Sequence, residues 1–264
     1  MRFFPADIPG LAIQYPVKRR RSQRAIHSVT PGGMLYRSID PGHRFVGWDL
    51  TFQNVTLSQR QELDDFFSGC EGRMQSFVFL DPFQNLVRHS EEFEHGAWEK
   101  DPSIVVLSNQ PDPMGSSQGR RLSNASGIAG AVVQRLSVPA WFSYTISCWM
   151  RATVPTNVEL CAHPAGTGGH SLFVTTTWQR HVMRVHQASN ETEIYAGLRL
   201  PSNSEIHAYG FQMEQFSSLS DYKRTVEEGG VITNSRFDQD EIRWVTSGID
   251  HHSTRIAIHA PLLP

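Results

Sequence analysis

The sequence predicts a protein made mainly of β-strands with one short helix. Two observations indicate this fold class. Apolar and polar residues alternate in many short stretches, and turn-forming residues separate these stretches. The chain has 264 residues, including 20 glycines and 15 prolines. It is therefore long enough for one large domain or two ordinary ones, each with a core of its own.

The first segment, residues 1–87, contains two clear strand patterns. Residues 45–52 alternate, which places Trp48, Leu50 and Phe52 on one face of a half-buried strand. Residues 74–80 return to the same pattern, and the following Asp-Pro pair closes that strand.

One helix is predicted between these strands. Ser58 and Gln61 have the spacing of a capping box, in which each residue satisfies a free amide of the other. An apolar stripe at helical spacing follows at Leu63, Phe66 and Phe67. A glycine after this stripe, at position 69 or 72, can end the helix.

The middle of the chain has a different texture, with short strands and no long helical pattern. In residues 144–151 the period of two is plain, because Tyr144, Ile146, Cys148 and Met150 point one way. Such a series predicts a β-sandwich or jelly roll. The seven predicted strands are 132–138, 144–152, 157–162, 171–177, 179–186, 193–200 and 205–215.

The last segment contains three further predicted strands, 231–238, 241–247 and 255–259. About forty residues cannot easily form an independent core, so we expect this segment to pack on the first one. The predicted organisation is therefore a discontinuous domain, 1–87 together with 226–264, with residues 88–225 inserted as a separate sandwich.

Composition bears on several classes of partner and compartment. The formal charge of −2 provides no bulk attraction to nucleic acid or to acidic membranes. No apolar stretch has the length of a signal peptide core or of a membrane span. The three cysteines are an odd number at irregular spacings, which argues against a disulfide framework and fits folding in a reducing cytoplasm; a pair between Cys148 and Cys161 is the minor alternative.

Two stretches resemble a known family of phage proteins. Phe66-Phe67, then Gly72-Arg73, then residues 76–82 (SFVFLDP) resemble the end of the ring-forming domain in distal tail proteins of long-tailed phages and gene transfer agents. Residues 231–238 (VITNSRFD) are similar to the final hairpin of that domain, in keeping with a discontinuous domain.

The insert carries a second resemblance. Residues 85–93 (NLVRHSEEF) followed by Ala97-Trp98 resemble the start of the carbohydrate-binding-module-like jelly rolls found in phage structural proteins. The stretches that follow match in the expected order: 144–152, 178–180, 208–214 and 221–225.

Together these resemblances imply a virion structural protein of the tail tip, assembled in the host cytoplasm. The family forms a homo-oligomeric ring, a hexamer, between the tail tube protein and the baseplate hub protein. The inserted jelly roll would be presented to host surface polysaccharide or to baseplate neighbours, with no membrane, no specific nucleic acid and no cofactor. Two competing hypotheses remain: a free carbohydrate-binding or carbohydrate-active protein without a ring, and a tail-fibre or hub-attached adaptor.

Catalytic and metal motifs are missing from the sequence. It contains no nucleophile elbow, no P-loop and no zinc-protease helix, and its twelve histidines lack the spacing of a metal site. The paired carboxylates at 91–92, 227–228 and 238/240 lie in polar turns or near strand ends, where we expect them to be solvated. We therefore predict that the chain is not an enzyme and has no metal site; the jelly-roll resemblance leaves a structural calcium near Glu91, Glu92 or Asp101 as the alternative, although the sequence shows no dedicated loop.

Aromatic side chains outside the core are the candidates for sugar binding, because a flat ring packs on the apolar face of a pyranose. Trp141 and Phe142 lie in a loop, and Trp149 falls opposite the apolar face of its strand. We predict these three as carbohydrate-binding, and protein contacts are the alternative. Trp98 and Trp178 are expected in the core.

A basic run, Lys18, Arg19, Arg20 and Arg21, with Arg24 close behind, is the strongest charge feature. Contact with DNA passing down a tail channel is one interpretation. We favour an assembly interface instead, since phosphate binding normally needs basic residues spread over a surface with aromatic partners.

Overall fold

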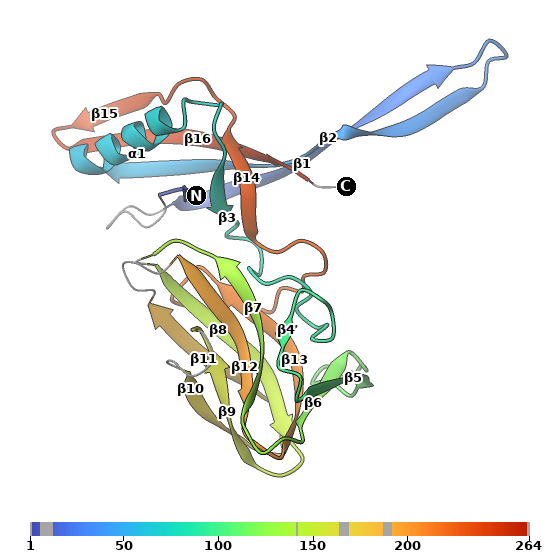
Figure 1. Cartoon of the computed structure of the whole chain (residues 1–264). Coiled ribbons are helices and arrows are strands. Elements are labelled where there is room, and N and C mark those ends of the chain that lie inside the picture. Colours follow the sequence, from blue (N-terminus) through green and yellow to red (C-terminus); the bar gives the residue numbers. More distant parts are fainter. Residues whose placement is uncertain (1, 6–12, 141, 164–168, 187–191, 263–264) are drawn as a thin grey trace. The chain divides into compact units, whose positions relative to one another are not determined.

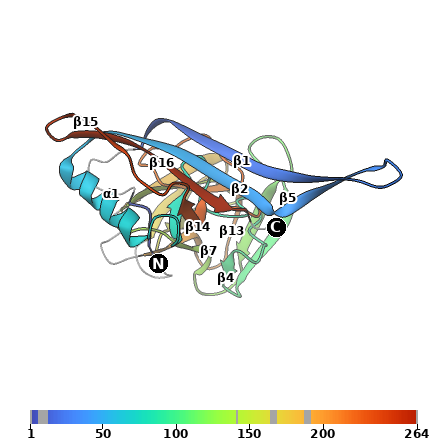
Figure 2. The same ribbon diagram turned by 90° about the horizontal axis from the view of Figure 1, so that it is seen from above.

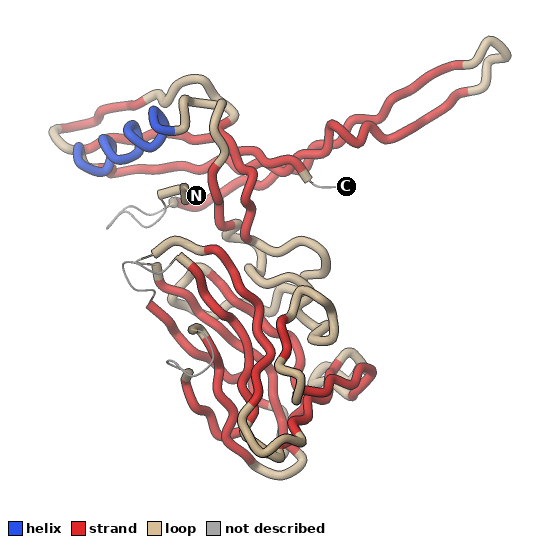
Figure 3. The backbone as a smooth tube through the Cα atoms, in the orientation of Figure 1, coloured by secondary structure: helices blue, strands red, loops and turns tan. Residues whose placement is uncertain are grey.

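The computed structural model describes all residues except 1, 6–12, 141, 164–168, 187–191 and 263–264. It is mainly β, with antiparallel sheets and one helix among the described residues, so the predicted fold class is confirmed (Figure 3). The chain divides into two compact units. We call Met1–Phe79 with Ile232–Pro264 the terminal unit, and Leu80–Val231 the sandwich unit.

A single sheet organises the terminal unit, with the order β1-β2-β16-β14-β3 and β15 paired to β16. The long antiparallel pairing of β16 with β2 joins the end of the chain to its beginning (Figure 1). The elements are β1 (Gln14–Val29), β2 (Leu35–Val55), α1 (Leu57–Gly69), β3 (Phe77–Leu80), β14 (Val231–Phe237), β15 (Trp244–Gly248) and β16 (His251–Pro261).

Aromatic packing forms the core of this unit. Trp48, Leu50 and Phe52 are fully buried on one face of β2, as the alternation predicted. On α1, Leu63 is buried, and Phe66 and Phe67 pack against the same cluster. The Phe67 and Phe237 ring centroids are 4.8 Å apart, so residues far apart in sequence share one core.

The start of α1 differs from the prediction. The N-cap is Thr56, whose hydroxyl accepts from the amide of Gln59 while the Gln59 side chain accepts from the amide of Thr56. Ser58 and Gln61, the predicted pair, have the same spacing. The helix begins two residues earlier, because Thr56 has an extended backbone directly after β2 and forms the capping box with Gln59. The helix ends at Gly69, and Gly72 turns the chain with a φ of +62°.

A two-stranded ribbon extends from the sheet. The β16 strand pairs with β2 only from Phe45 onward, whereas β1 and β2 pair to Val29 and Leu35. Residues 25–39, which we call the ribbon, therefore continue without a third strand among the described residues (Figures 1 and 2). The sequence did not predict this hairpin. Neither face of the ribbon is buried, so its residues do not alternate between apolar and polar.

Two five-stranded antiparallel sheets form the sandwich unit. We call the order β10-β9-β12-β7-β4 the β12 sheet and the order β11-β8-β13-β6-β5 the β8 sheet. The strands are β4 (Glu99–Lys100), β5 (Ile104–Gln110), β6 (Gly119–Asn124), β7 (Gly130–Ser137), β8 (Ser143–Ala152), β9 (Thr156–Cys161), β10 (His170–Val174), β11 (Gln179–His186), β12 (Glu193–Leu200) and β13 (Ser204–Glu214).

The inner faces of the two sheets are apolar. Tyr144, Ile146, Cys148 and Met150 are fully buried along β8, as the period of two predicted. Every second residue of β12, from Ile194 to Leu200, is buried as well. Cys148 and Cys161 are both free thiols, so the minor alternative of a disulfide is wrong.

All seven strands predicted for this unit are present, and 179–186 and 193–200 have the predicted bounds. Three others, β4, β5 and β6, were missed. The β5 strand exposes Val105 and Leu107, and β6 carries two consecutive arginines, so neither shows the alternation of a strand with one buried face.

Candidate functional site

The outer face of the β8 sheet carries the candidate site. Side chains on β8 alternate, so the apolar residues face the core and Thr145, Ser147, Trp149 and Arg151 face away from it. The neighbouring strands β11 and β13 pair with β8, so their outward side chains lie beside those of β8.

One row of side chains crosses this face at Arg151. Arg151 pairs with His207 of β13, and His207 pairs with Arg121 of β6. Trp178, directly before β11, completes the row. The Arg151 Cζ lies 5.2 Å from the centroid of the Trp178 ring, and the His207 ring meets the same ring edge-on at 6.4 Å. All four side chains are half-buried.

A second row lies beside the first, where Arg180, Trp149 and Tyr209 occupy paired positions on β11, β8 and β13. Trp149 is half-buried. The Tyr209 ring is buried and lies 5.6 Å from the ring of Tyr222. We call Arg121, Trp149, Arg151, Trp178 and His207 the open face.

Several N–H groups and ring nitrogens on the open face lack a protein partner. Trp149 Nε1, Arg151 Nε and His207 Nδ1 are shielded by their surroundings, yet none forms a hydrogen bond within the described part of the chain. Arg121 Nε lies 3.6 Å from a Glu205 oxygen, beyond hydrogen-bond distance. Buried polar groups without partners are uncommon in proteins, so these atoms mark a place for a ligand or ordered water.

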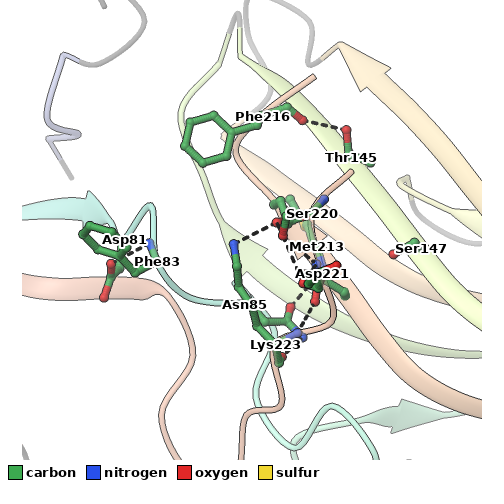
Figure 4. A network of polar contacts seen from close by, with 12 residues as sticks. Asp81, Phe83, Asn85, Thr145, Ser147, Met213, Phe216, Ser220, Asp221 and Lys223 are labelled. Atoms are coloured by element: carbon green, nitrogen blue, oxygen red, sulfur yellow. Dashed lines mark hydrogen bonds and ion pairs between the residues drawn. The ribbon is translucent and has the colours of Figure 1, made fainter. Parts of the chain in front are cut away.

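The other end of the same sheet face is closed by residues 216–223. The Thr145 hydroxyl donates to the carbonyl of Phe216 at 2.6 Å, and Arg180 donates to the carbonyl of Ser220 at 2.9 Å. Figure 4 shows the hydrogen bond between Thr145 and Phe216, with Ser220, Asp221 and Lys223 of the same segment nearby. Thr145, Ser147 and Gln212 are fully buried, so β8 and β13 are covered at this end, whereas Arg184 at the β11 edge stays exposed.

An ion pair fixes the closing segment. The Glu214 carboxylate bonds Lys223 Nζ at 2.9 Å and accepts from both the amide and the hydroxyl of Ser220. Burial works to raise the pKa of Glu214, but these hydrogen bonds outweigh it and hold the pKa below its ordinary value. The closed end is therefore a structural cover with its charges satisfied.

A hollow of about 460 Å³ lies at the loop end of the sandwich. Hydroxyl, amide and carboxylate side chains line it, among them Ser123, Thr153, Asn203 and Glu205. Glu205 links the hollow to the open face, since it accepts from Thr153 Oγ1 at 3.4 Å and lies beside Arg121. The combined surface therefore offers aromatic rings, cationic N–H donors and hydroxyl groups.

The ionisable groups of the face respond to partial burial. Burial, followed by the nearby Arg151 charge, lowers the pKa of His207. Burial also lowers the pKa of Arg180 and raises that of Tyr209 to about 12. Near neutral pH, His207 is therefore uncharged and presents one donor and one acceptor.

The predicted sugar-binding residues are only partly brought together. Trp149 lies on the open face. Phe142 instead packs beside the buried Tyr144, with ring centroids 5.4 Å apart, so it is on the core side of β8. Trp141 lies outside the described residues. Trp98 is buried in the core as expected, but Trp178 is not, because Arg151 and His207 hold its ring on the outer face.

The basic run lies in β1 and has a different setting. Lys18, Arg20 and Arg21 are exposed and Arg19 is half-buried. Arg20 bonds Asp238 Oδ2 at 2.6 Å within the terminal unit. At least this arginine therefore connects β1 to the loop after β14 of its own chain, in addition to any role in assembly.

The carboxylates at 91 and 92 were expected to be solvated, and for Glu91 this is wrong. Glu91 is 3% exposed, bonds Arg224 Nε at 3.0 Å and accepts from the Tyr222 hydroxyl at 3.2 Å. The chain folds residues 222–225 back over it, which no local pattern indicated. Glu92 bonds His89 at 2.7 Å, and this hydrogen bond lowers the pKa of Glu92.

The described residues contain neither a metal-binding cluster nor a membrane-spanning helix. No cluster of three or more histidines, cysteines or carboxylates is arranged to hold a metal ion. No helix has the length and apolar character needed to cross a membrane.

Comparison with known proteins finds similarity among solved structures alone, since no family model and no curated protein matches the sequence. The C-terminal family 22 carbohydrate-binding module of Clostridium thermocellum Xyn10B is 12% identical, with a TM-score of 0.41; the match covers 54% of this chain and 99% of the module. The CBM22-1 xylan-binding domain of Paenibacillus barcinonensis Xyn10C is 13% identical, with a TM-score of 0.40 and coverage of 53% and 99%.

A phage protein is also similar. The enzymatically active domain of tailspike protein 4 of bacteriophage CBA120 is 14% identical, with a TM-score of 0.39; the match covers 52% of this chain. The chain spans 22% of the length of that tailspike domain.

Sequence analysis missed Arg121, Arg151 and His207 as site residues. Each lies in a strand at an outward position, and arginine or histidine there is ordinarily just a solvated surface residue. The useful signal was the register: all three fall on the same face as Trp149 once the strands are paired. That pairing cannot be deduced from one strand at a time.

Proposed function

We propose that the sandwich unit binds carbohydrate through the open face, and that the chain is a structural protein of a phage tail tip. The observation that carries the first part is the combination of Trp149 and Trp178 with N–H donors that lack acceptors in the described chain. The apolar face of a sugar ring packs on an indole, and its hydroxyls accept from such donors.

The binding role is also preferred to a catalytic one. The carboxylate nearest the open face, Glu205, is engaged by Thr153 and lies beside Arg121. A glycosidase needs two carboxyl groups flanking the bond that is cleaved. The open face presents rings and cationic donors around a single carboxylate, an arrangement that suits holding a polymer.

Assembly is proposed to run through the terminal unit. The ribbon exposes apolar side chains on both of its faces, including Val29, Tyr36 and Ile39, each at least 60% exposed. An isolated two-stranded ribbon is only marginally stable in water, and exposed apolar patches mark interfaces. A second copy of this chain is the proposed partner, and repetition of that contact closes a ring.

The finer parts of this proposal follow the resemblance of residues 66–82 and 231–238 to distal tail proteins. The ring is a hexamer at the tail tip of the virion, with the tail tube protein on one side and the baseplate hub protein on the other. Lys18 and Arg21, exposed on β1 near the ribbon, supply charged contacts to a neighbouring subunit.

Carbohydrate binding is tested with the full chain on an array of bacterial surface polysaccharides. We expect at least one polymer to bind, and Trp149→Ala to lose that binding. Tyr195→Ala is the matched control, since Tyr195 lies on β12, in the other sheet of the same unit. Equal binding by the wild type and the Trp149→Ala variant would contradict the site, and the absence of any bound polymer would contradict the function.

Assembly is tested by light scattering and negative-stain imaging of the full chain. We expect rings, and we expect Val29→Ser with Ile39→Ser to yield monomers of unchanged melting temperature. Val105→Ser with Leu107→Ser serves as control, because these exposed apolar residues lie in the sandwich unit. A monomeric wild-type chain would favour the alternative, a free carbohydrate-binding protein without a ring.

A further inference from the structure

The two outer faces of the sandwich unit differ in how far their arginines are paired with carboxylates. On the β12 sheet, Arg135 of β7 bonds both carboxylate oxygens of Glu193 at 2.7 Å. Arg199 of β12 lies 3.4 Å from a carboxylate oxygen of Glu159 on β9. Each arginine therefore faces a carboxylate on the neighbouring strand, and this face is close to neutral.

On the β8 sheet this compensation is incomplete. Arg151 forms no ion pair among the described residues, and its immediate neighbours are the ring of Trp178 and the imidazole of His207. Arg121 reaches Glu205 only at 3.6 Å. Arg180 donates to the carbonyl of Ser220 and to the hydroxyl of Ser147, both of which are uncharged acceptors.

Positive charge is therefore in excess across this outer face. Of the acidic groups there, Glu205 lies beside Arg121, Glu214 bonds Lys223, and Asp221 lies near Arg180. That pairing leaves Arg151 without a carboxylate, and Arg184 is exposed further along β11. The chain as a whole has a formal charge of −2, so the excess is local to this face.

The Arg151 guanidinium is also suited to bind an anion. Its Nε is shielded from solvent and has no acceptor among the described residues. The Trp178 ring beside it restricts its conformations, so little side-chain freedom is lost on binding. A carboxylate or sulfate can accept two parallel hydrogen bonds from a guanidinium, and such charge-assisted bonds are about twice as strong as neutral ones.

We propose that the ligand of the open face is an acidic polysaccharide, with a carboxylate or sulfate of the polymer bound by Arg151 and a neighbouring sugar ring packed on Trp149. The hydroxyl-lined hollow at Ser123, Thr153 and Ser204 takes the next sugar along the chain. This inference rests on the carbohydrate-binding function proposed above and adds the chemical class of the polymer.

The experiment compares each acidic polymer with its own neutral form. Full-length protein is titrated calorimetrically with polygalacturonate, alginate and chondroitin sulfate, and with the carboxyl-reduced or desulfated product of each. Single-stranded DNA is included as a flexible polyanion whose charges are phosphodiesters and which has no pyranose rings. We expect at least one acidic polymer to bind at least about tenfold more tightly than its neutral form and than DNA.

Three variants locate the effect. Arg151→Gln removes the charge and should lower affinity for the acidic polymer by about tenfold or more, to the level of the neutral form. Arg151→Lys keeps the charge but not the paired donors and should fall between. Arg199→Gln, in the other sheet, should bind like the wild type. Melting temperatures of all three confirm folding.

Each outcome decides the question. Equal binding of the acidic and neutral forms, lost in Trp149→Ala, would overturn the acidic class and leave carbohydrate binding in place. Binding of no polymer in either form would overturn both. DNA binding equal to that of the acidic polymer, or equal losses in Arg151→Gln and Arg199→Gln, would indicate general attraction of anions and would also overturn the inference.

Discussion

The guanidinium of Arg151 lies over the ring of Trp178, with 5.2 Å between its Cζ and the ring centroid. Arg151 lies near the end of β8, and Trp178 lies in the turn directly before β11, the neighbouring strand of the same sheet. The contact turns a tryptophan that the sequence placed in the core into part of an outward surface. It also positions a positive charge that forms no ion pair among the described residues.

We predict that Trp178→Ala weakens polysaccharide binding by about 5- to 30-fold, because the variant loses a packing surface and frees the Arg151 side chain. Tyr195→Ala is the matched control, since Arg135 lies over Tyr195 at 5.9 Å on the other sheet. Affinity electrophoresis of both variants checks this, and equal mobility shifts for the two would contradict the assignment.

Asn85 ties the entry of the sandwich unit to its last strand. Its amide donates to the carbonyls of Phe211 at 2.7 Å and Lys223 at 3.2 Å, and its oxygen accepts from the amide of Met213 at 2.9 Å (Figure 4). We predict that Asn85→Ala lowers the free energy of unfolding by about 2–4 kcal/mol, since several buried backbone groups lose their partners.

Urea unfolding measures this effect. The control is Asn157→Ala, because Asn157 is an exposed residue of β9. A loss of similar size in both variants would show that the Asn85 network carries no special stability.

The corrected helix start gives a paired test. Thr56→Ala removes the hydroxyl that accepts from Gln59, and we expect the terminal unit to lose about 1 kcal/mol of unfolding free energy. Ser58→Ala, inside the first turn, should change it by less than about 0.5 kcal/mol. The reverse order of losses would restore Ser58 as the cap.

Acid should destabilise the sandwich unit through its partly buried histidines. Burial lowers the pKa of His181 and His207 below the ordinary 6.5, so the unfolded chain binds more protons once the pH falls below that value. Stability is therefore present above about pH 6.5 and declines as the pH falls toward the folded-state pKa.

The test compares unfolding free energies at about pH 7 and about pH 5, in the wild type and in the double variant His181→Gln with His207→Gln. We expect the double variant to lose less. Carboxylates such as Glu92, whose pKa is lowered by its hydrogen bond with His89, add their own losses only below the ordinary 4.5. Identical losses in the two proteins would exclude the histidines as the cause.

The spacing of apolar residues along the sequence correctly predicted which faces of β8 and α1 are buried. The alternation from Tyr144 to Met150 correctly gave the inner face of β8, and the stripe at Leu63 and Phe66 correctly gave the buried face of α1. In both elements one face is buried along its whole length. Apolar residues therefore recur once per turn in the helix and at every second residue in the strand.

Features that depend on distant parts of the chain were not predictable in this way. Glu91 is buried because Tyr222 and Arg224 fold over it, and Trp178 is turned outward by Arg151 and His207. Phe142 and Trp149, seven residues apart, lie on opposite sides of β8. Each of these outcomes is set by strand pairing or loop closure, and neither leaves a signal in the local sequence.

The central claim is that the outer face of the β8 sheet holds a sugar polymer. The most direct measurement is a crystal structure of the full chain with an oligosaccharide of the polymer that it binds. We expect sugar density over Trp149, with an acidic group at the Arg151 guanidinium. Sugar bound to the β12 sheet or to the terminal unit, with the open face empty, would contradict the account.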